Sequence, residues 1–374
     1  MTDFSLDRPV VSERRFQSRT QVLSDLSSLS SESQAAIRQF SVHRLTSYGL
    51  AQADAHELLE RVYQGQVWMT AALDLARECL APKEASMSKK TEVGVLFRTA
   101  ALSRAAQMMM IQDDEVRHDL FANAAGLYDR AAQVKGDRSR YEIDATGGRI
   151  VAWRFPARVP RVATAMVFGG IEGWAMDFAA LGEDLAARGI EAHLIDGPGQ
   201  GESRFRYHTY LSRDWQSSYR DIVGHVAALA GDTPLFIVGN SMGGCLVMNY
   251  AATDTRISGI CSNGGPRRPP ELAGELPSKI KKFHVFCGDV PVSEAAAIWG
   301  DMDAAAAMSK SQTPLLIVHG GRDPFVEAAE LDPILAGGPD RTMVTFSDGE
   351  HCIYNHPEDK HDLIGDWILA RAAS

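Results

Sequence analysis

Residues 235–244 have the sequence LFIVGNSMGG, an apolar run followed by the pattern G-x-S-x-G. This pattern predicts a sharp turn between a buried strand and a helix, which lifts the hydroxyl of Ser241 into a pocket. Gly239 and Gly243 have no side chain, so the strand and the helix can approach closely while Ser241 adopts a strained conformation. The apolar residues 245–252 that follow are typical of a buried helix. We therefore predict a nucleophilic serine at position 241; the alternative is an ordinary strand–helix turn with an exposed serine.

The composition limits the classes of protein to consider. The 374 residues, 45% of them hydrophobic, suffice for one large domain and a second, smaller one. The formal net charge of −10 argues against nucleic acid or an anionic membrane as a partner. The five cysteines have no C-x-x-C spacing, so neither a disulfide framework nor a metal site is expected. Because we find neither a secretory signal nor an apolar run of about 18 residues, we expect a cytoplasmic protein. We expect no cofactor.

The hydrophobic periodicity changes along the chain. Residues 1–30 are rich in Ser, Arg and Asp and predict an arm that is disordered or lies on another surface. Residues 31–138 have helical periodicity, clearest in 55–63 and 67–80, and predict a domain of four or five helices. Such a domain would serve either as a cap over a small-molecule substrate or as a scaffold that forms a homodimer.

From residue 139 to residue 374, short apolar segments alternate with helical ones. A Thr-Gly-Gly turn between 141–144 and 149–155 predicts a hairpin. Further strands are predicted at 163–168, 190–195, 235–238, 257–261, 315–318 and 343–346. Apolar strands separated by helices predict an α/β fold, with a mostly parallel sheet covered on both faces. Residues 264–313 exceed the length of one crossover and predict a lid insertion or helical excursion; the alternative is an extended crossover.

A serine hydroxyl needs a base to remove its proton and an acid to orient that base. In this kind of fold the expected chain order is Ser, then Asp or Glu, then His. Asp323 follows the predicted strand 315–318, and His351 follows the predicted strand 343–346. Because the carboxyl ends of parallel strands meet at one edge of the sheet, we expect Asp323 and His351 to converge on Ser241.

Other residues compete for the roles of acid and base. Asp289 is the rival acid, although the segment before it is a weaker strand candidate. Asp323 could instead be only a turn former before a proline. His356 and His361 are the rival bases. His356 lies near the start of the predicted final helix, 358–370, and His361 lies inside it.

The tetrahedral intermediate of acyl chemistry needs hydrogen-bond donors for its oxyanion. The backbone N–H of Met242 is the first candidate. The second should come from residues 169–174, GGIEGW, where Ile171 is the first choice and Gly170 the next. Glu172 in the same loop either faces solvent or caps a helix, or it is a pocket carboxylate with a raised pKa that polarises or protonates the substrate.

Residues 196–203, DGPGQGES, form a second glycine-rich segment. They lack the Lys-Ser/Thr ending of a phosphate-binding loop and the G-x-G-x-x-G spacing of a dinucleotide-binding fold. We therefore predict a tight structural loop beside the pocket.

Together these motifs resemble the α/β-hydrolase superfamily over about residues 140–374. The helical N-terminal region, with GGIE at 169–172, DGPGQGE at 196–202 and GNSMGG at 239–244, resembles a narrower group. That group contains 2,6-dihydropseudooxynicotine hydrolase, fungal polyketide-shortening hydrolases and FrsA-like esterases. Several of its members cleave a carbon–carbon bond next to a ketone, with a helical domain covering the site.

This resemblance implies that Ser241, Asp323 and His351 form a triad and that Glu172 is an added acid. Residues 173–177, GWAMD, differ from the more polar sequence of the nicotine enzyme, which leaves the substrate open. We expect a serine hydrolase that attacks a ketone or acyl carbonyl of a small, largely apolar or aromatic metabolite, with C–C bond hydrolysis as the leading reaction. The alternatives are a carboxylesterase, an acyl-transfer or cyclising enzyme and, less favoured, a non-catalytic binding or regulatory protein.

Overall fold

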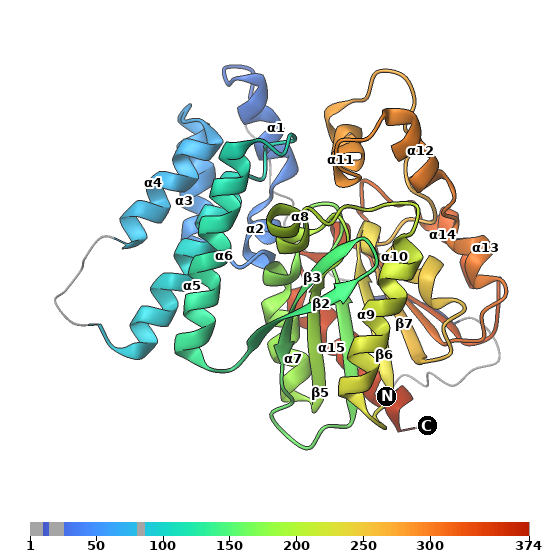
Figure 1. Ribbon diagram of the computed structural model, residues 1–374. Helices are drawn as coiled ribbons and strands as arrows, with labels where there is room; N and C mark the ends of the chain where they lie inside the picture. Colours follow the sequence, from blue (N-terminus) through green and yellow to red (C-terminus); the bar gives the residue numbers. More distant parts are fainter. Residues whose placement is uncertain (1–9, 15–25, 81–86, 374) are drawn as a thin grey trace. The chain divides into compact units, whose positions relative to one another are not determined.

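The computed structural model describes residues 10–14, 26–80 and 87–373 (Figure 1). The chain divides into two compact units. One comprises Tyr141–Ser374 together with the N-terminal segment Met1–Gln17, and the other is Ser18–Arg140. The division falls close to the boundary at residue 138 that the change of periodicity predicts.

Six helices form the smaller unit within its described residues. They are α1 (Ser31–Gln39), α2 (Val42–Ser47), α3 (Gln52–Tyr63), α4 (Trp68–Leu80), α5 (Lys89–Ala106) and α6 (Glu115–Lys135). The prediction of four or five helices is wrong because α1 and α2 are too short to show a clear period. Serine caps mark their starts instead: the hydroxyls of Ser30 and Ser41 accept hydrogen bonds from backbone N–H groups of the first turn.

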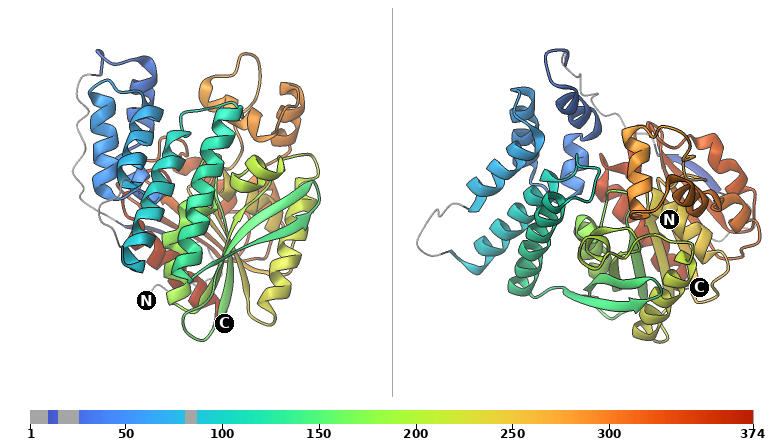
Figure 2. Two further views of the ribbon diagram at one scale, coloured as in Figure 1. Left: turned by 60° about the vertical axis from the view of Figure 1, so that its left-hand side comes forward. Right: turned by 45° about the horizontal axis from the view of Figure 1, so that its top comes forward.

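The two longest helices of this unit, α5 and α6, lie side by side (Figure 2). Small residues are buried on both helices, among them Ala105 on α5 and Ala124 and Ala131 on α6. The indole N–H of Trp68 donates to the backbone oxygen of Ala105 at 2.8 Å, so a buried polar group is satisfied within the helical core.

A nine-stranded sheet is the centre of the larger unit, in the order β1-β9-β8-β7-β6-β4-β5-β3-β2. The strands are β1 (Val10–Arg14), β2 (Ser139–Ala145), β3 (Gly148–Phe155), β4 (Ala163–Phe168), β5 (Ile190–Asp196), β6 (Leu235–Asn240), β7 (Ile257–Asn263), β8 (Leu315–Gly320) and β9 (Arg341–Phe346). Along this order the first seven strands, β1-β9-β8-β7-β6-β4-β5, are all paired in parallel. The next strand, β3, runs antiparallel to β5. Each predicted strand is present, with bounds that differ by no more than two residues at either end.

Helices cover both faces of this sheet, as expected for central strands that are apolar throughout. Figure 1 shows α9 (Trp215–Ala230) and α10 (Met242–Ala251) on one face and α15 (Pro357–Ala372) on the other. α7 (Ala179–Ala187) packs beside α15. This arrangement confirms the predicted α/β fold.

The predicted insertion between β7 and β8 contains three helices. They are α11 (Ser278–Phe286), α12 (Val292–Gly300) and α13 (Ala304–Met308), and α14 (Ala328–Leu335) follows after β8. The connection is therefore a helical excursion rather than an extended crossover. Its apolar residues, such as Phe286 and Trp299, are buried in the main core.

Two short elements were not expected from the sequence. Within the predicted N-terminal arm, residues 10–14 form β1, which pairs with β9 and is itself an edge strand of the sheet; most of the arm lies outside the described residues. Residues 196–203 were predicted to be a loop throughout, but the loop ends at Gln200 and α8 (Gly201–Tyr207) begins at the next residue. The cause is Asp196, whose carboxylate accepts a hydrogen bond from the Glu202 N–H at 2.8 Å and satisfies the start of this helix.

Candidate active site

The G-x-S-x-G segment forms the predicted strand–turn–helix. Ser241 lies between β6 and α10 with φ 55° and ψ −131°, a conformation that is strained for a residue with a side chain. Its N–H donates to the backbone oxygen of Asn263 at 2.8 Å, and its own backbone oxygen accepts from Gly244 at 2.8 Å. These bonds hold the strained residue in place.

Glycine is required around Ser241 because backbones meet there. A Cβ atom on Gly239 would lie 2.3 Å from the backbone oxygen of Gly243. A Cβ atom on Gly170 would lie 2.7 Å from Cβ and 3.1 Å from Oγ of Ser241. The loop that begins at Gly169 therefore lies directly against the serine.

Ser241, His351 and Asp323 are joined by two hydrogen bonds. Nε2 of His351 lies 2.8 Å from Oγ of Ser241, and Nδ1 lies 2.7 Å from Oδ2 of Asp323. With the proton on Nδ1, the imidazole donates to the carboxylate and accepts from the serine hydroxyl. Both the acid and the base come from loops at the carboxyl ends of strands, β8 and β9 respectively.

The carboxylate of Asp323 is itself fixed by its own loop. Its side chain is fully buried, and Oδ1 accepts hydrogen bonds from the N–H groups of Phe325 (2.8 Å) and Val326 (3.3 Å). Asp323 is thus a turn former and also the partner of His351, so the two interpretations of this residue are compatible.

The surroundings of His351 change its basicity. Burial lowers the pKa of the imidazole, whereas Cys352 and the hydrogen bond to the Asp323 carboxylate raise it. The net direction of the pKa is upward, because Cys352 and then the buried Asp323 carboxylate together outweigh the effect of burial. His351 is therefore a stronger base than a free histidine.

The competing acid and bases occupy other positions. Asp289 is exposed in the loop after α11. His356 hydrogen-bonds Oδ1 of Asp348 at 2.9 Å, and His361 lies within α15. Burial, with Lys360 and Arg188 nearby, lowers the pKa of His361 to about 3. Of the three histidines, His351 is the one that hydrogen-bonds Ser241.

The candidate oxyanion donors lie next to the serine. Met242 is the first residue of α10, so its N–H has no acceptor within the helix. Gly170 and Ile171 belong to the loop after β4, and the side chain of Gln200 donates to the backbone oxygens of Gly169 (2.6 Å) and Gly170 (3.1 Å). Both donor positions are thus close to Ser241, and their roles remain predictions.

Glu172 forms an ion pair with Lys282 of α11. The two side chains are only 13% and 12% exposed. A neighbouring ammonium group stabilises the ionised carboxylate, so this contact favours a charged Glu172 over the protonated acid, which was one of the two interpretations of this residue. Its role in proton transfer stays a prediction.

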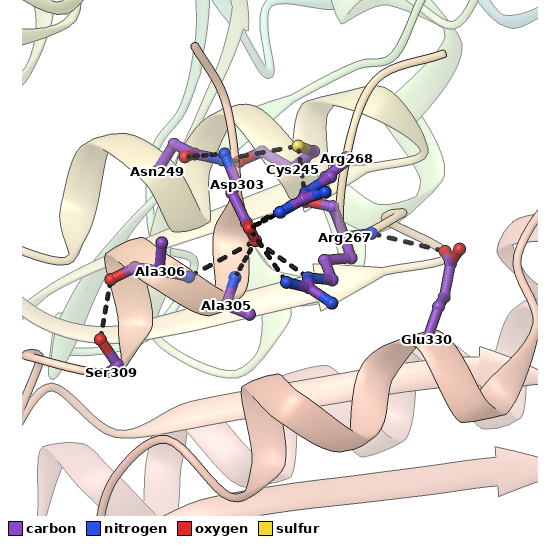
Figure 3. Close-up of polar contacts among 9 residues, drawn as sticks. All are labelled: Cys245, Asn249, Arg267, Arg268, Asp303, Ala305, Ala306, Ser309 and Glu330. Carbon is purple, nitrogen blue, oxygen red and sulfur yellow. Dashed lines mark hydrogen bonds and ion pairs between the residues drawn. The ribbon is translucent and has the colours of Figure 1, made fainter. Parts of the chain in front are cut away.

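Two arginines and an aspartate form a cluster at the base of the helical excursion, where its first residues meet the start of α13 (Figure 3). Arg267 makes two hydrogen bonds to the carboxylate of Asp303, and Arg268 makes two more. The bonds from Arg267 have the largest effect, and together with those from Arg268 they hold the pKa of Asp303 far below its ordinary value. Asn249 of α10 accepts a hydrogen bond from the Asp303 N–H at 3.0 Å, which attaches the cluster to the helix that follows Ser241.

Several residues around the site were not predicted from the sequence. The side-chain amide of Asn263 donates to Oδ1 of Asn240 at 2.8 Å and to the backbone oxygen of Cys352 at 3.2 Å, and so joins the serine turn to the histidine loop. The ring of Phe325 lies 4.9 Å from that of His351 and is 49% exposed. The available signal was position: both residues lie at or just after the carboxyl end of a strand.

The described part of the chain contains neither a metal-binding cluster nor a membrane-spanning helix. Among residues 10–14, 26–80 and 87–373, no group of three or more His, Cys, Asp or Glu side chains could hold a metal ion. Within the same ranges, every helix is too short or too polar to cross a membrane.

Comparison with known proteins shows what this chain is similar to. Residues 160–287 match the family model described as "Serine aminopeptidase, S33". The 2,6-dihydropseudooxynicotine hydrolase of Paenarthrobacter nicotinovorans is 25% identical over 311 residues, which cover 80% of this chain and 82% of that protein. A monoacylglycerol lipase of Mycolicibacterium smegmatis is 23% identical over 282 residues, or 63% of this chain and 99% of the lipase.

Solved structures show the same fold. The crystal structure of 2,6-dihydroxy-pseudo-oxynicotine hydrolase superimposes with a TM-score of 0.74 at 21% identity, covering 88% of this chain and 95% of that one. AbyA5 gives 0.67 at 18% identity, with 90% and 99% covered. The matching family model, the sequence relatives and the fold identify the chain as an α/β-hydrolase enzyme that resembles the group containing 2,6-dihydropseudooxynicotine hydrolase.

Proposed function

We propose that this enzyme is a serine hydrolase that attacks a ketone or acyl carbonyl of a small, largely apolar or aromatic metabolite. The observation that carries the proposal is the hydrogen-bonded chain from Ser241 through His351 to Asp323. The strained backbone of Ser241 supports it, since strain of this kind concentrates at functional residues.

In the first step, Nε2 of His351 accepts the hydroxyl proton while Oγ of Ser241 bonds to the carbonyl carbon. The carbonyl oxygen becomes an oxyanion, for which the N–H groups of Met242 and of Ile171 or Gly170 are the proposed donors. Asp323 stays ionised and stabilises the imidazolium of His351.

Collapse of the intermediate breaks the bond between the carbonyl carbon and the leaving group. In C–C hydrolysis a stabilised carbanion or enolate leaves and takes its proton from the imidazolium of His351, directly or by way of the Glu172 carboxylate; in ester hydrolysis an alkoxide leaves and takes the proton from His351. Water, deprotonated by His351, then attacks the acyl-enzyme and releases a carboxylic acid and free Ser241.

The resemblance to the 2,6-dihydropseudooxynicotine hydrolase group supports C–C hydrolysis as the leading reaction. Ester hydrolysis is the second candidate, supported by the similarity to a monoacylglycerol lipase over most of the lipase's length. Both reactions use the same triad and differ in the leaving group.

Product analysis separates the two reactions. Purified enzyme is incubated with β-diketones, aryl ketones and matched esters, and the fragments are identified by mass spectrometry. We expect a carboxylic acid and a shortened ketone from the β-diketones, and no turnover by the Ser241→Ala variant. Turnover of esters alone would reject the C–C proposal, and turnover unchanged in Ser241→Ala would reject the serine mechanism.

The Glu172→Gln variant tests the proposed proton donor within the same assay. If Glu172 protonates the carbon leaving group, this variant loses C–C cleavage while it still hydrolyses an ester with a good leaving group, because such a leaving group needs no proton. An equal effect on both substrates would assign Glu172 a role in structure alone.

A further inference from the structure

Gln200 is a buried side chain for which sequence analysis assigned no function. Its side chain lies between two loops and is only 1% exposed. Oε1 accepts a hydrogen bond from the N–H of Gly197 at 2.9 Å, within its own loop. Nε2 donates to the backbone oxygens of Gly169 (2.6 Å) and Gly170 (3.1 Å), in the loop that follows β4. The amide group therefore uses its acceptor on one loop and its donors on the other.

These contacts determine how two backbone N–H groups are oriented. A peptide unit is planar, and in its trans form the C=O and the following N–H point in opposite directions. Because the C=O of Gly169 and that of Gly170 are directed at Gln200, the N–H groups of Gly170 and Ile171 are directed away from it. These are the two N–H groups proposed as the second oxyanion donor.

The same peptides lie against the nucleophile. A Cβ atom on Gly170 would be 3.1 Å from Oγ of Ser241. The loop is also attached to the serine turn, because the side chain of Asn240 donates to the backbone oxygen of Phe168 at 3.2 Å. A rotation of either peptide would therefore move a donor relative to the atom that attacks.

The position of Gln200 is itself held from several sides. The N–H of Arg204 donates to its backbone oxygen at 3.0 Å, since Gln200 is the residue before α8. Gly199 has φ 83°, and a Cβ atom there would lie 2.3 Å from the ring of Phe286 on α11. The segment is fixed between α8 and the helical excursion, as a rigid support requires.

We propose that Gln200 is a positioning residue that aims the backbone N–H groups of Gly170 and Ile171 at the oxyanion formed on Ser241. The inference rests on the proposed serine hydrolase function. Gln200 does not touch the reacting atoms; it acts through the peptide planes of the loop. Its loss therefore weakens transition-state stabilisation more than substrate binding.

The test measures the rate at which a fluorophosphonate probe modifies the enzyme, because phosphonylation of a serine also develops charge on an oxygen. The variants are Gln200→Leu, which removes donors and acceptor, and Gln200→Asn, which keeps the amide but shortens its reach. The matched control is Ser203→Ala, which removes another buried side chain of this segment, bonded to the backbone of Asp196 and Val151. Intact-protein mass spectrometry gives both the fraction of chains that react and the rate constant.

We expect both Gln200 variants to react to completion with a rate constant lowered about 10²-fold, comparable to loss of one oxyanion donor. The kcat for an ester falls by a similar factor at an unchanged KM, while Ser203→Ala keeps the wild-type rate. A smaller reactive fraction at an unchanged rate constant would show a purely structural role and overturn the inference. So would equal rates for Gln200→Leu and Ser203→Ala. Failure of the wild-type enzyme to react at all would instead overturn the proposed function.

Discussion

Gly243 and Gly169 are in backbone-to-backbone contact: a Cβ atom on Gly243 would lie only 2.1 Å from the backbone oxygen of Gly169. This contact presses the start of α10, with the nucleophile at its N-terminal side, against the loop that carries the proposed oxyanion donors. The proposed catalytic geometry therefore depends on two residues that have no side chain. A side chain added at Gly243 would meet backbone atoms, which cannot move aside as a flexible side chain could.

Gly243→Ala is expected to lower both stability and activity. Forcing a methyl group against backbone atoms costs about 1–3 kcal/mol in packed cores, and here it also displaces a donor loop. Gly224→Ala is the matched control in α9, because its Cβ would meet only the end of the Arg256 side chain, at 3.2 Å. Thermal unfolding and ester kcat are measured for both; a Gly243→Ala enzyme indistinguishable from Gly224→Ala would contradict the packing described here.

The pH profile of kcat/KM should report the basicity of His351. In the proposed mechanism the neutral imidazole is the active form, and the net effect of its surroundings raises the pKa of His351. Activity is therefore expected to fall as the pH drops through a midpoint above the ordinary histidine value of about 6.5.

Asp323→Asn tests the cause of that midpoint. Burial lowers the pKa of His351 and the Asp323 carboxylate raises it, so removal of the carboxylate should lower this pKa. The midpoint should move to lower pH, and kcat should fall by about 10⁴-fold because a neutral amide neither holds the histidine in the tautomer that accepts from Ser241 nor stabilises the imidazolium. A midpoint that stays in place would mean that Asp323 does not act on His351.

Asn263 should matter for turnover more than for substrate binding. Asn263→Ala removes the donor that joins Oδ1 of Asn240 to the backbone oxygen of Cys352, so the serine turn and the histidine loop lose their connection. Small displacements of catalytic groups can cost about 10²-fold, and we expect a fall in kcat of that order with little change in KM.

The control for this effect is Asn249→Ala. Asn249 also bonds to backbone groups, those of Cys245 and Asp303, but at the base of the helical excursion. Its loss should lower the melting temperature without the large fall in kcat. Equal kcat values for the two variants would argue against a specific role for Asn263.

Lys282→Met is expected to loosen α11. The variant leaves the mostly buried carboxylate of Glu172 without its ammonium partner, and breaking a buried ion pair in this way costs about 3 kcal/mol. Hydrogen exchange of residues 278–286 should become faster, and Lys282→Arg should restore slow exchange. Lys281→Met is the control, because Lys281 is an exposed neighbour on the same helix; a similar acceleration in this variant would contradict the assignment.

Much of the fold and the three proposed catalytic residues could be predicted from the sequence, for a physical reason. Strands such as β6 and β8 are buried on both faces, so their composition alone marks them, and Asp323 and His351 follow their strands in the order that the topology requires. The glycines around Ser241 mark the turn because no other residue fits there.

The supporting residues could not be predicted, because their roles depend on contacts between distant segments. Gln200 and Asn263 contact backbone oxygens at separations of 31 and 89 residues, which no local pattern encodes. The helix α8 was hidden by the glycines before it, and the Lys282–Glu172 pair joins α11 to a loop 110 residues away. Such residues are found only when the fold has brought the segments together.

The central claim is that Ser241 is a nucleophile activated by His351, and peptide mapping after reaction with a fluorophosphonate tests it most directly. The account predicts a single adduct, located on Ser241, that is absent from Ser241→Ala and forms far more slowly in His351→Ala. An unmodified wild-type enzyme, or an adduct that forms equally fast in Ser241→Ala, would contradict it.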